Sequence, residues 1–197
     1  MKLLQLLPVG HIEDRLLRDL EQAIPRCLKV NCEILPALLD PEPTLHPERQ
    51  QYHSSQILHR MQSFVTEQTW RVLGVADVDL YIPILKYVFG EAQMGGPCAI
   101  VSSHRLRQES YGLDRDDDLL GQRLLKESLH ELGHTLNLPH CEDYRCIMAS
   151  AHAVEWIDLR EPGLCEGCMK KAVLAIGLER YPISASYCSR PVPRVEK

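Results

Sequence analysis

The sequence predicts an α/β fold in which helices pack on a mixed, twisted sheet, followed by an irregular carboxy-terminal part. Two observations predict it. Residues 1–136 alternate strand-like and helix-like apolar patterns, the order expected when helices cover a sheet. Residues 137–197 show few regular patterns but are dense in cysteine and proline. We therefore expect a single domain over residues 1–197, with a scaffold (1–136) followed by a carboxy-terminal subdomain (137–197).

Composition and charge narrow the class of protein. With 45% hydrophobic and 25% charged residues, the 197-residue chain has the balance of a globular protein and is long enough to bury a full core. The net charge is -5 and no block of Lys and Arg stands out, so nucleic acid is not an expected partner. The apolar run Leu3–Leu7 is too short for a membrane helix and lacks the cleavage site of a secretory signal. We expect a cytoplasmic protein that does not bind membranes.

The first elements follow from apolar spacing. Residues 2–8 form an apolar run that predicts a buried strand, and residues 11–24 carry apolar side chains at helical spacing up to Pro25. Residues 27–35 alternate apolar and polar side chains, which predicts a half-buried strand. Residues 36–47 are rich in proline and acid and should form a loop.

The scaffold continues with a predicted long amphipathic helix over residues 47–67 and a strongly apolar strand over residues 72–82. The inner side of that helix would carry Tyr52, Ile57, Met61 and Val65. A pair of strands is expected at residues 87–92 and 99–103, joined through Gly95-Gly96-Pro97. Glycine and proline beside the last strand suit the edge of a sheet.

The next helix, expected over residues 116–136, begins with three aspartates that suit its N-terminus and carries His130, Glu131 and His134 near its end. Positions four apart on a helix lie about 40° apart around its axis and roughly 6 Å apart along it. Two imidazoles can therefore meet one metal ion, with Glu131 close to a water on that ion. A surface helix that happens to carry two histidines and a glutamate fits these five residues as well.

His140 favours a metal site over a surface helix that carries these residues by chance. On a continuous helix it would face about 240° away from His134, so the chain must break before it. Pro139 disfavours helical geometry at the preceding residue, and Asn137 tolerates the left-handed conformation that ends helices. Since a catalytic zinc takes three protein ligands and keeps one position open, we expect zinc at His130, His134 and His140.

Four of the eight cysteines fall close together after His140. Cys141 and Cys146 are separated by four residues, and Cys165 and Cys168 by two, which are spacings typical of a structural zinc. Two disulfides or four unrelated thiols are the alternatives. A helix is expected from Cys168 to Leu178. The remaining cysteines have apolar neighbours and are predicted to be core residues: Cys27, Cys32, Cys98 and Cys188.

The run from His130 to His140 resembles the metzincin signature, and its continuation through Cys141, Cys146, Met148, Cys165 and Cys168 resembles the archaemetzincin family. The resemblance implies three histidines on a catalytic zinc, Glu131 as general base, four cysteines on a second zinc, and Met148 in a turn under the metal. Asn137 replaces the usual glycine, and no tyrosine directly follows Met148, so oxyanion stabilisation is unassigned. The family also implies an edge strand that pairs with substrate, for which Gly95–Ser102 is our candidate.

These observations predict a zinc metallopeptidase that holds two zinc ions per chain and hydrolyses a peptide or protein substrate with water activated beside Glu131. Two alternatives stay open at this point. One is a non-catalytic, zinc-stabilised binding protein, and the other is a zinc hydrolase of a small amide. The sequence does not predict an oligomeric state.

Overall fold

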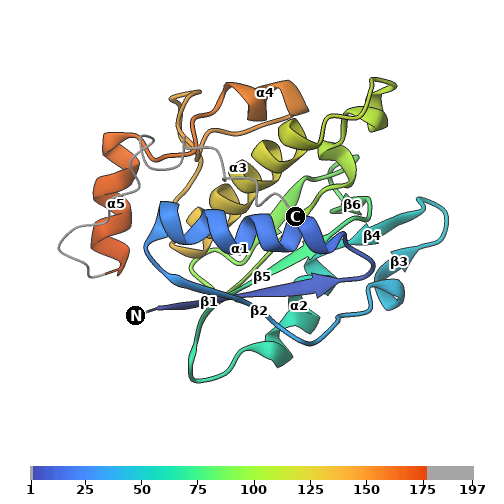
Figure 1. Ribbon diagram of the computed structural model, residues 1–197, viewed down its shortest axis with the longest axis horizontal. Coiled ribbons are helices and arrows are strands. Elements are labelled where there is room, and N and C mark those ends of the chain that lie inside the picture. Colours follow the sequence, from blue (N-terminus) through green and yellow to red (C-terminus); the bar gives the residue numbers. More distant parts are fainter. Residues whose placement is uncertain (1, 177–197) are drawn as a thin grey trace, which may run out of the picture.

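The computed structural model describes residues 2–176. Its main sheet has five strands in the order β2-β1-β5-β8-β7 (Figure 1). Its strands are β1 (Leu3–Val9), β2 (Asn31–Ile34), β5 (Thr69–Ala76), β7 (Gly90–Ala92) and β8 (Cys98–Ser102). The first three pairings are parallel, and only β7 runs antiparallel to its neighbour β8. The predicted mixed α/β fold is confirmed. That residues 1–197 form a single domain stays a prediction.

Helices cover both faces of this sheet (Figure 1). The α-helices are α1 (Asp14–Leu28), α2 (Ser54–Met61), α3 (Asp117–Thr135), α4 (Val154–Leu159) and α5 (Glu166–Ile176). Short 3-10 turns occur at η1 (Glu42–Thr44), η2 (Gln62–Phe64), η3 (His104–Leu106) and η4 (Gln108–Tyr111). A second, three-stranded sheet is formed by β3 (Leu45–His46), β4 (Gln51–His53) and β6 (Leu80–Tyr81).

Alternating strand residues divide the core into two layers. Leu6 and Leu73 belong to the cluster that packs under α1 and α3, whereas their neighbours Leu7 and Val72 pack with α2. Successive side chains of a strand point to opposite faces, so α1 and α3 lie on one face of the sheet and α2 on the other.

Three of the predicted helices have other bounds in the structure. The first does not end at Pro25: α1 continues to Leu28, and the Lys29 N–H bonds to the Pro25 carbonyl at 2.9 Å. Proline in the last turn removes a single N–H, and burial of Cys27 and Leu28 against the core favours the extra turn.

The predicted helix over residues 47–67 was wrong. Residues 51–53 form β4, which pairs with β6, and the helix itself is the shorter α2. The Tyr52 N–H bonds to the Asp79 carbonyl at 2.8 Å, so long-range strand pairing replaces the local helical pattern here. The predicted strand 72–82 is likewise two strands, β5 and β6.

The strand pair around Gly95-Gly96-Pro97 is confirmed as β7 and β8, and the helix at 116–136 as α3. The helix predicted from Cys168 begins two residues earlier, at Glu166. Its expected end at Leu178, and Cys188, lie outside the described residues. Of the other expected core cysteines, Cys27 and Cys98 are buried and Cys32 is half-buried.

Candidate metal centre

Helix α3 presents the first part of the site. The Asp116 side chain caps its N-terminus by accepting the Leu119 N–H at 2.9 Å. Near the other end, His130 and Glu131 are buried and His134 is half-buried. The four-residue spacing brings the His130 and His134 rings to 4.6 Å between centroids.

A tight turn after α3 returns His140 to the other two histidines. Asn137 adopts the left-handed conformation, with φ 63°, and the Leu138 N–H bonds back to the Gly133 carbonyl at 3.2 Å. His140 then lies 5.3 Å from His130 and 4.9 Å from His134 between ring centroids. One nitrogen from each of the three rings lies within 4.8 Å of the others. We call these three residues the histidine group.

Backbone carbonyls determine which ring nitrogens face the centre of this group. His130 Nδ1 lies 2.7 Å from the Ile147 oxygen and His134 Nδ1 lies 2.8 Å from the Leu138 oxygen. A carbonyl oxygen only accepts, so each Nδ1 carries the proton and each Nε2 presents a lone pair. The two Nε2 atoms are 3.1 Å apart. Two lone pairs this close repel each other unless a cation lies between them.

The surroundings favour a metal cation over a proton at this point. Burial lowers the pKa of His130 well below its ordinary value, and burial also lowers the pKa of His134. Both shifts favour the neutral imidazole, which is the form that ligates metal. The donor set of three neutral nitrogens with protonated, hydrogen-bonded Nδ1 atoms fits zinc.

Glu131 lies beside the histidine group without belonging to it. Its side chain is buried, and burial raises its pKa well above the ordinary value, with the nearby Glu127 acting in the same direction. Strand β7 passes directly next to it. A Cβ added to Gly90 would come within 2.7 Å of Glu131 Cγ and 2.9 Å of its Oε1. Glycine at position 90 therefore gives this carboxylate its space.

Met148 packs under the end of α3. A Cβ on Gly133 would lie 2.3 Å from the Met148 sulfur, so the methionine occupies the space that a side chain at 133 would need. The Met148 carbonyl accepts the Cys141 N–H at 2.8 Å. The turn with Met148 is thereby joined to the residue that follows His140.

The second predicted set of ligands also converges. The sulfur atoms of Cys141, Cys146, Cys165 and Cys168 lie within 4.8 Å of one another, and we call these residues the cysteine group. The Cys141 and Cys165 sulfurs are 3.7 Å apart, and the Cys165 N–H points to the Cys146 sulfur at 3.3 Å. Burial raises the pKa of Cys146 to about 11. Four sulfur atoms this close suit a shared metal ion, which stabilises the thiolates.

The proposed substrate strand Gly95–Ser102 was wrong. Most of it is β8, which pairs with β5 on one side and β7 on the other and so has no free edge. The outer strand of the sheet is β7. Glycine and proline in the connecting turn gave no indication of which of the two strands lies outside.

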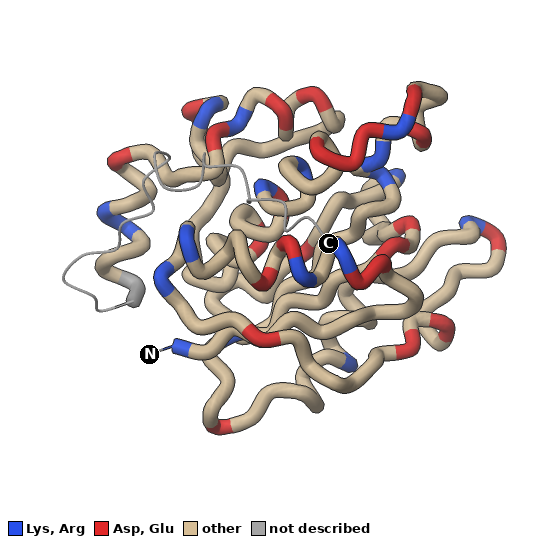
Figure 2. The backbone as a smooth tube through the Cα atoms, viewed as in Figure 1, with Lys and Arg blue, Asp and Glu red and all other residues tan. Residues whose placement is uncertain are grey.

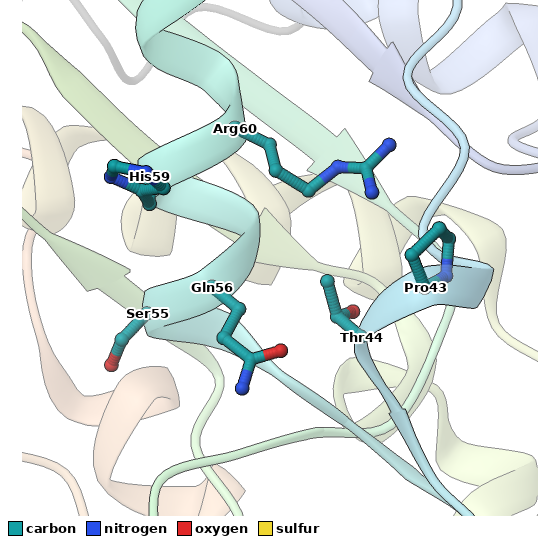
Figure 3. A pocket seen from close by; sticks show the side chains of 6 residues that line it. All are labelled: Pro43, Thr44, Ser55, Gln56, His59 and Arg60. Atoms are coloured by element: carbon teal, nitrogen blue, oxygen red, sulfur yellow. The ribbon is translucent and has the colours of Figure 1, made fainter.

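One pocket lies apart from the histidine group. A pocket lined by Pro43, Thr44, Ser55, Gln56, His59 and Arg60 lies between α2 and η1 (Figure 3). It is on the α2 side of the sheet, opposite α3.

Sequence reasoning missed Gly90, Glu127 and Arg160, which surround Glu131. A glutamate three residues before His130 was the only available signal, and it has no motif of its own.

Charge and hydropathy add two facts. Lys and Arg are interspersed with Asp and Glu along the described chain (Figure 2). None of the helices within residues 2–176 is both long and apolar enough to cross a membrane. The cytoplasmic location and the absence of nucleic-acid binding stay predictions.

Comparison with known proteins identifies a matching family model and similar sequences. The model of peptidase family M54 matches residues 40–173. An archaemetzincin of Methanocaldococcus jannaschii is 40% identical over 164 residues, covering 83% of this chain and 89% of that protein. One from Thermococcus kodakarensis is 31% identical over 179 residues, covering 87% and 95%.

Solved structures agree with the sequence comparisons. The archaemetzincin of Archaeoglobus fulgidus, crystallised with malonate, superposes with a TM-score of 0.74 at 28% identity, covering 86% of this chain and 99% of that one. A zinc-dependent peptidase from Methanocorpusculum labreanum superposes with a TM-score of 0.78 at 26% identity and the same coverage. The resemblance noted in the sequence is confirmed: this chain belongs to peptidase family M54, the archaemetzincins.

Proposed function

We propose that this protein is a zinc-dependent metallopeptidase of the metzincin type, with its catalytic zinc on the histidine group. The observation that carries the proposal is the pair of bare Nε2 atoms on His130 and His134, 3.1 Å apart. Their geometry is unfavourable without a cation, and burial, which lowers the pKa of both imidazoles, disfavours a proton. Family membership supports zinc as that cation.

Glu131 is the proposed general base. A zinc ion on three imidazoles supplies Lewis acidity for the attack of water on a carbonyl. The Glu131 carboxylate accepts one proton from the attacking water and passes it to the departing amine nitrogen, so the peptide bond is exchanged for an acid and an amine. Burial supports this role, because it raises the carboxylate's affinity for the proton it must hold between the two steps.

The cysteine group is proposed to hold a second zinc, which gives two ions per chain. Four sulfur ligands complete a tetrahedral site and leave no open position, so its role is structural. It supports the irregular segment between His140 and α5.

Strand β7 is the proposed substrate-binding edge. It is the outer strand of the sheet, and Gly90 places its backbone next to Glu131. An extended peptide that added to this edge would have its backbone held by main-chain hydrogen bonds close to the general base. A peptide or protein is therefore favoured over a small amide, which could not use the strand edge.

Replacing Glu131 with Gln tests the function. Gln keeps the shape but cannot accept the proton, so we expect zinc content to stay unchanged while peptide turnover falls by about 10²–10⁴-fold. Glu142→Gln, which changes an exposed carboxylate nearby, is the matched control and should keep full turnover. A Glu131→Gln protein with unimpaired biological activity would instead support a zinc-stabilised binding protein. Hydrolysis of small amides without any cleavage of peptides would support the second alternative.

A further inference from the structure

A buried ion pair continues the line of active-site residues on α3. Glu127 lies three residues before His130 and four before Glu131, so the three side chains share one face of the helix. Its Oε2 atom is 2.6 Å from Nη1 of Arg160, and the two side chains are 4% and 1% exposed. Neither residue has a part in the mechanism above.

Arg160 belongs to the segment that orients His130. It directly follows α4, and the next residue, Glu161, donates its N–H to the Arg145 carbonyl at 2.7 Å. The Ile147 N–H bonds to the Gly163 carbonyl at 2.8 Å. Residues 145–147 and 161–163 are thus held together, and the Ile147 carbonyl is the one that accepts from His130 Nδ1 at 2.7 Å.

The ion pair and the histidine contact therefore join α3 to one and the same segment at two adjacent points, and Lys126 adds bonds from α3 to the Ile157 and Asp158 carbonyls of that segment. Glu127 contacts its Arg160 end, and His130 contacts its Ile147 end. With both contacts made, the segment has little freedom to slide along α3. The Glu127–Arg160 contact thus lies on the same segment as the Ile147 carbonyl that directs the His130 ring.

Stability alone does not account for this pair. Two charges removed from water lose hydration that their attraction only partly restores, and apolar residues of similar volume are often as stable. Arg160 Nε is also buried and, among residues 2–176, has no hydrogen-bond partner. An incompletely satisfied buried cation adds to the cost.

We propose that Glu127 and Arg160 are positioning residues, which align His130 for metal binding and Glu131 for proton transfer by fixing segment 145–163 against α3. The proposal rests on the proposed function only for its effect on turnover. Its effect on metal binding can be measured whether or not the protein cleaves peptides.

The chain offers a matched control. Arg123 and Asp158 form a two-pronged ion pair between α3 and α4, with Nε–Oδ1 at 2.7 Å and Nη2–Oδ2 at 2.6 Å. Arg123 lies one helical turn before Glu127, farther from the histidine group along α3. Loss of this pair also weakens the contact between α3 and α4, but it removes neither partner of the Glu127–Arg160 ion pair.

The experiment compares Glu127→Leu/Arg160→Met with the control Arg123→Met/Asp158→Asn and the wild type. Three properties are measured on the full chain loaded with zinc: thermal unfolding, zinc affinity in competition with a chelator, and the separate values of kcat and KM. We expect both double variants to fold. In the test variant alone, zinc affinity at the histidine group and kcat should each fall roughly 10–100-fold, while KM changes little.

The opposite results overturn the proposal. If zinc affinity and kcat fell equally in both double variants, the Glu127–Arg160 pair would act through general stability. If the test variant kept wild-type zinc affinity and kcat, the pair would not position the site. If that variant does not fold, Arg160→Lys decides, because it keeps the charge but loses the planar fork. It should unfold near the wild-type temperature with weakened zinc binding, and unchanged affinity would refute the idea. A wild-type protein without peptidase activity would refute the proposed function, and zinc affinity would still test the ion pair.

Discussion

The histidine group and the cysteine group are neighbours along the chain, but they are built in opposite ways. Two of the three histidines stand on α3, a 19-residue helix with a capped N-terminus and a buried face. The cysteines lie in a segment with little regular structure, where Cys141 forms an isolated β-bridge with Ala149, Cys146 lies in a bend, and only Cys165 and Cys168 flank the start of a helix. The first site is a product of the fold, whereas we propose that the fold of the second segment depends on metal bound by the cysteine group.

The two groups meet at a single peptide bond, between His140 and Cys141. The Cys141 N–H bonds to the Met148 carbonyl, and Met148 packs against Gly133 in α3. A metal ion that holds Cys141 therefore also holds His140 in place. This difference, between a site built on a helix and a segment proposed to be held by metal, which share the His140–Cys141 peptide bond, can be tested from both sides.

The largest effect is expected from Cys165→Ser, which removes one sulfur from the cysteine group. Folding and metal binding are coupled in such segments, so the free energy of unfolding should fall by several kcal/mol, which appears as a lower Tm. Metal analysis should find one zinc ion fewer per chain. Zinc affinity at the histidine group should fall as well, because His140 loses its support. Cys32→Ser, at a half-buried thiol outside the group, should change neither property. Full and equally tight binding at the histidine group would disprove the coupling.

A smaller effect is expected where the helix-built side contacts Met148. Gly133→Ala would place a methyl 2.3 Å from the Met148 sulfur, and such overpacking costs about 1–3 kcal/mol. Gly121→Ala lies on the same helix with no atom within 4 Å of the added methyl, so it should stabilise the protein by up to about 1 kcal/mol. Chemical denaturation of both variants measures the difference. Equal free energies of unfolding would show that Met148 does not pack tightly under α3.

The smallest effect is expected at the turn between the two groups. Asn137 has φ 63°, a conformation that costs an alanine roughly 1–2 kcal/mol and a glycine almost nothing. Asn137→Ala should therefore lower the free energy of unfolding by about 1 kcal/mol and weaken zinc binding at the histidine group, whereas Asn137→Gly should match the wild type. If alanine were tolerated without loss, the left-handed turn would not be what brings His140 to the other histidines.

Local sequence predicted the residues that converge in the site better than it predicted their surroundings. Spacing along one helix, a residue that tolerates the left-handed conformation, and paired cysteines are all visible within short windows. The surroundings were missed for a physical reason. Glu127 forms an ion pair with Arg160, which lies 33 positions later in the chain, and no local pattern marks either residue. Gly90 matters only because β7 passes next to Glu131.

The same division explains the errors in the fold. Residues 47–67 have a helical apolar pattern, but Tyr52 pairs with the chain near Asp79, and that distant contact outweighs the local preference. The choice of edge strand also depended on which segments pair, not on glycine and proline content.

By itself, the sequence determined α3 with its cap, the break at Asn137, and the two sets of ligand-type residues. Each of these follows from backbone preferences and side-chain spacing over a few residues. Only the tertiary structure decided that β7 is the outer strand beside Glu131 and that a buried arginine faces Glu127. Those features arise from contacts between segments far apart in the chain, whose free energy appears only when the whole core is assembled.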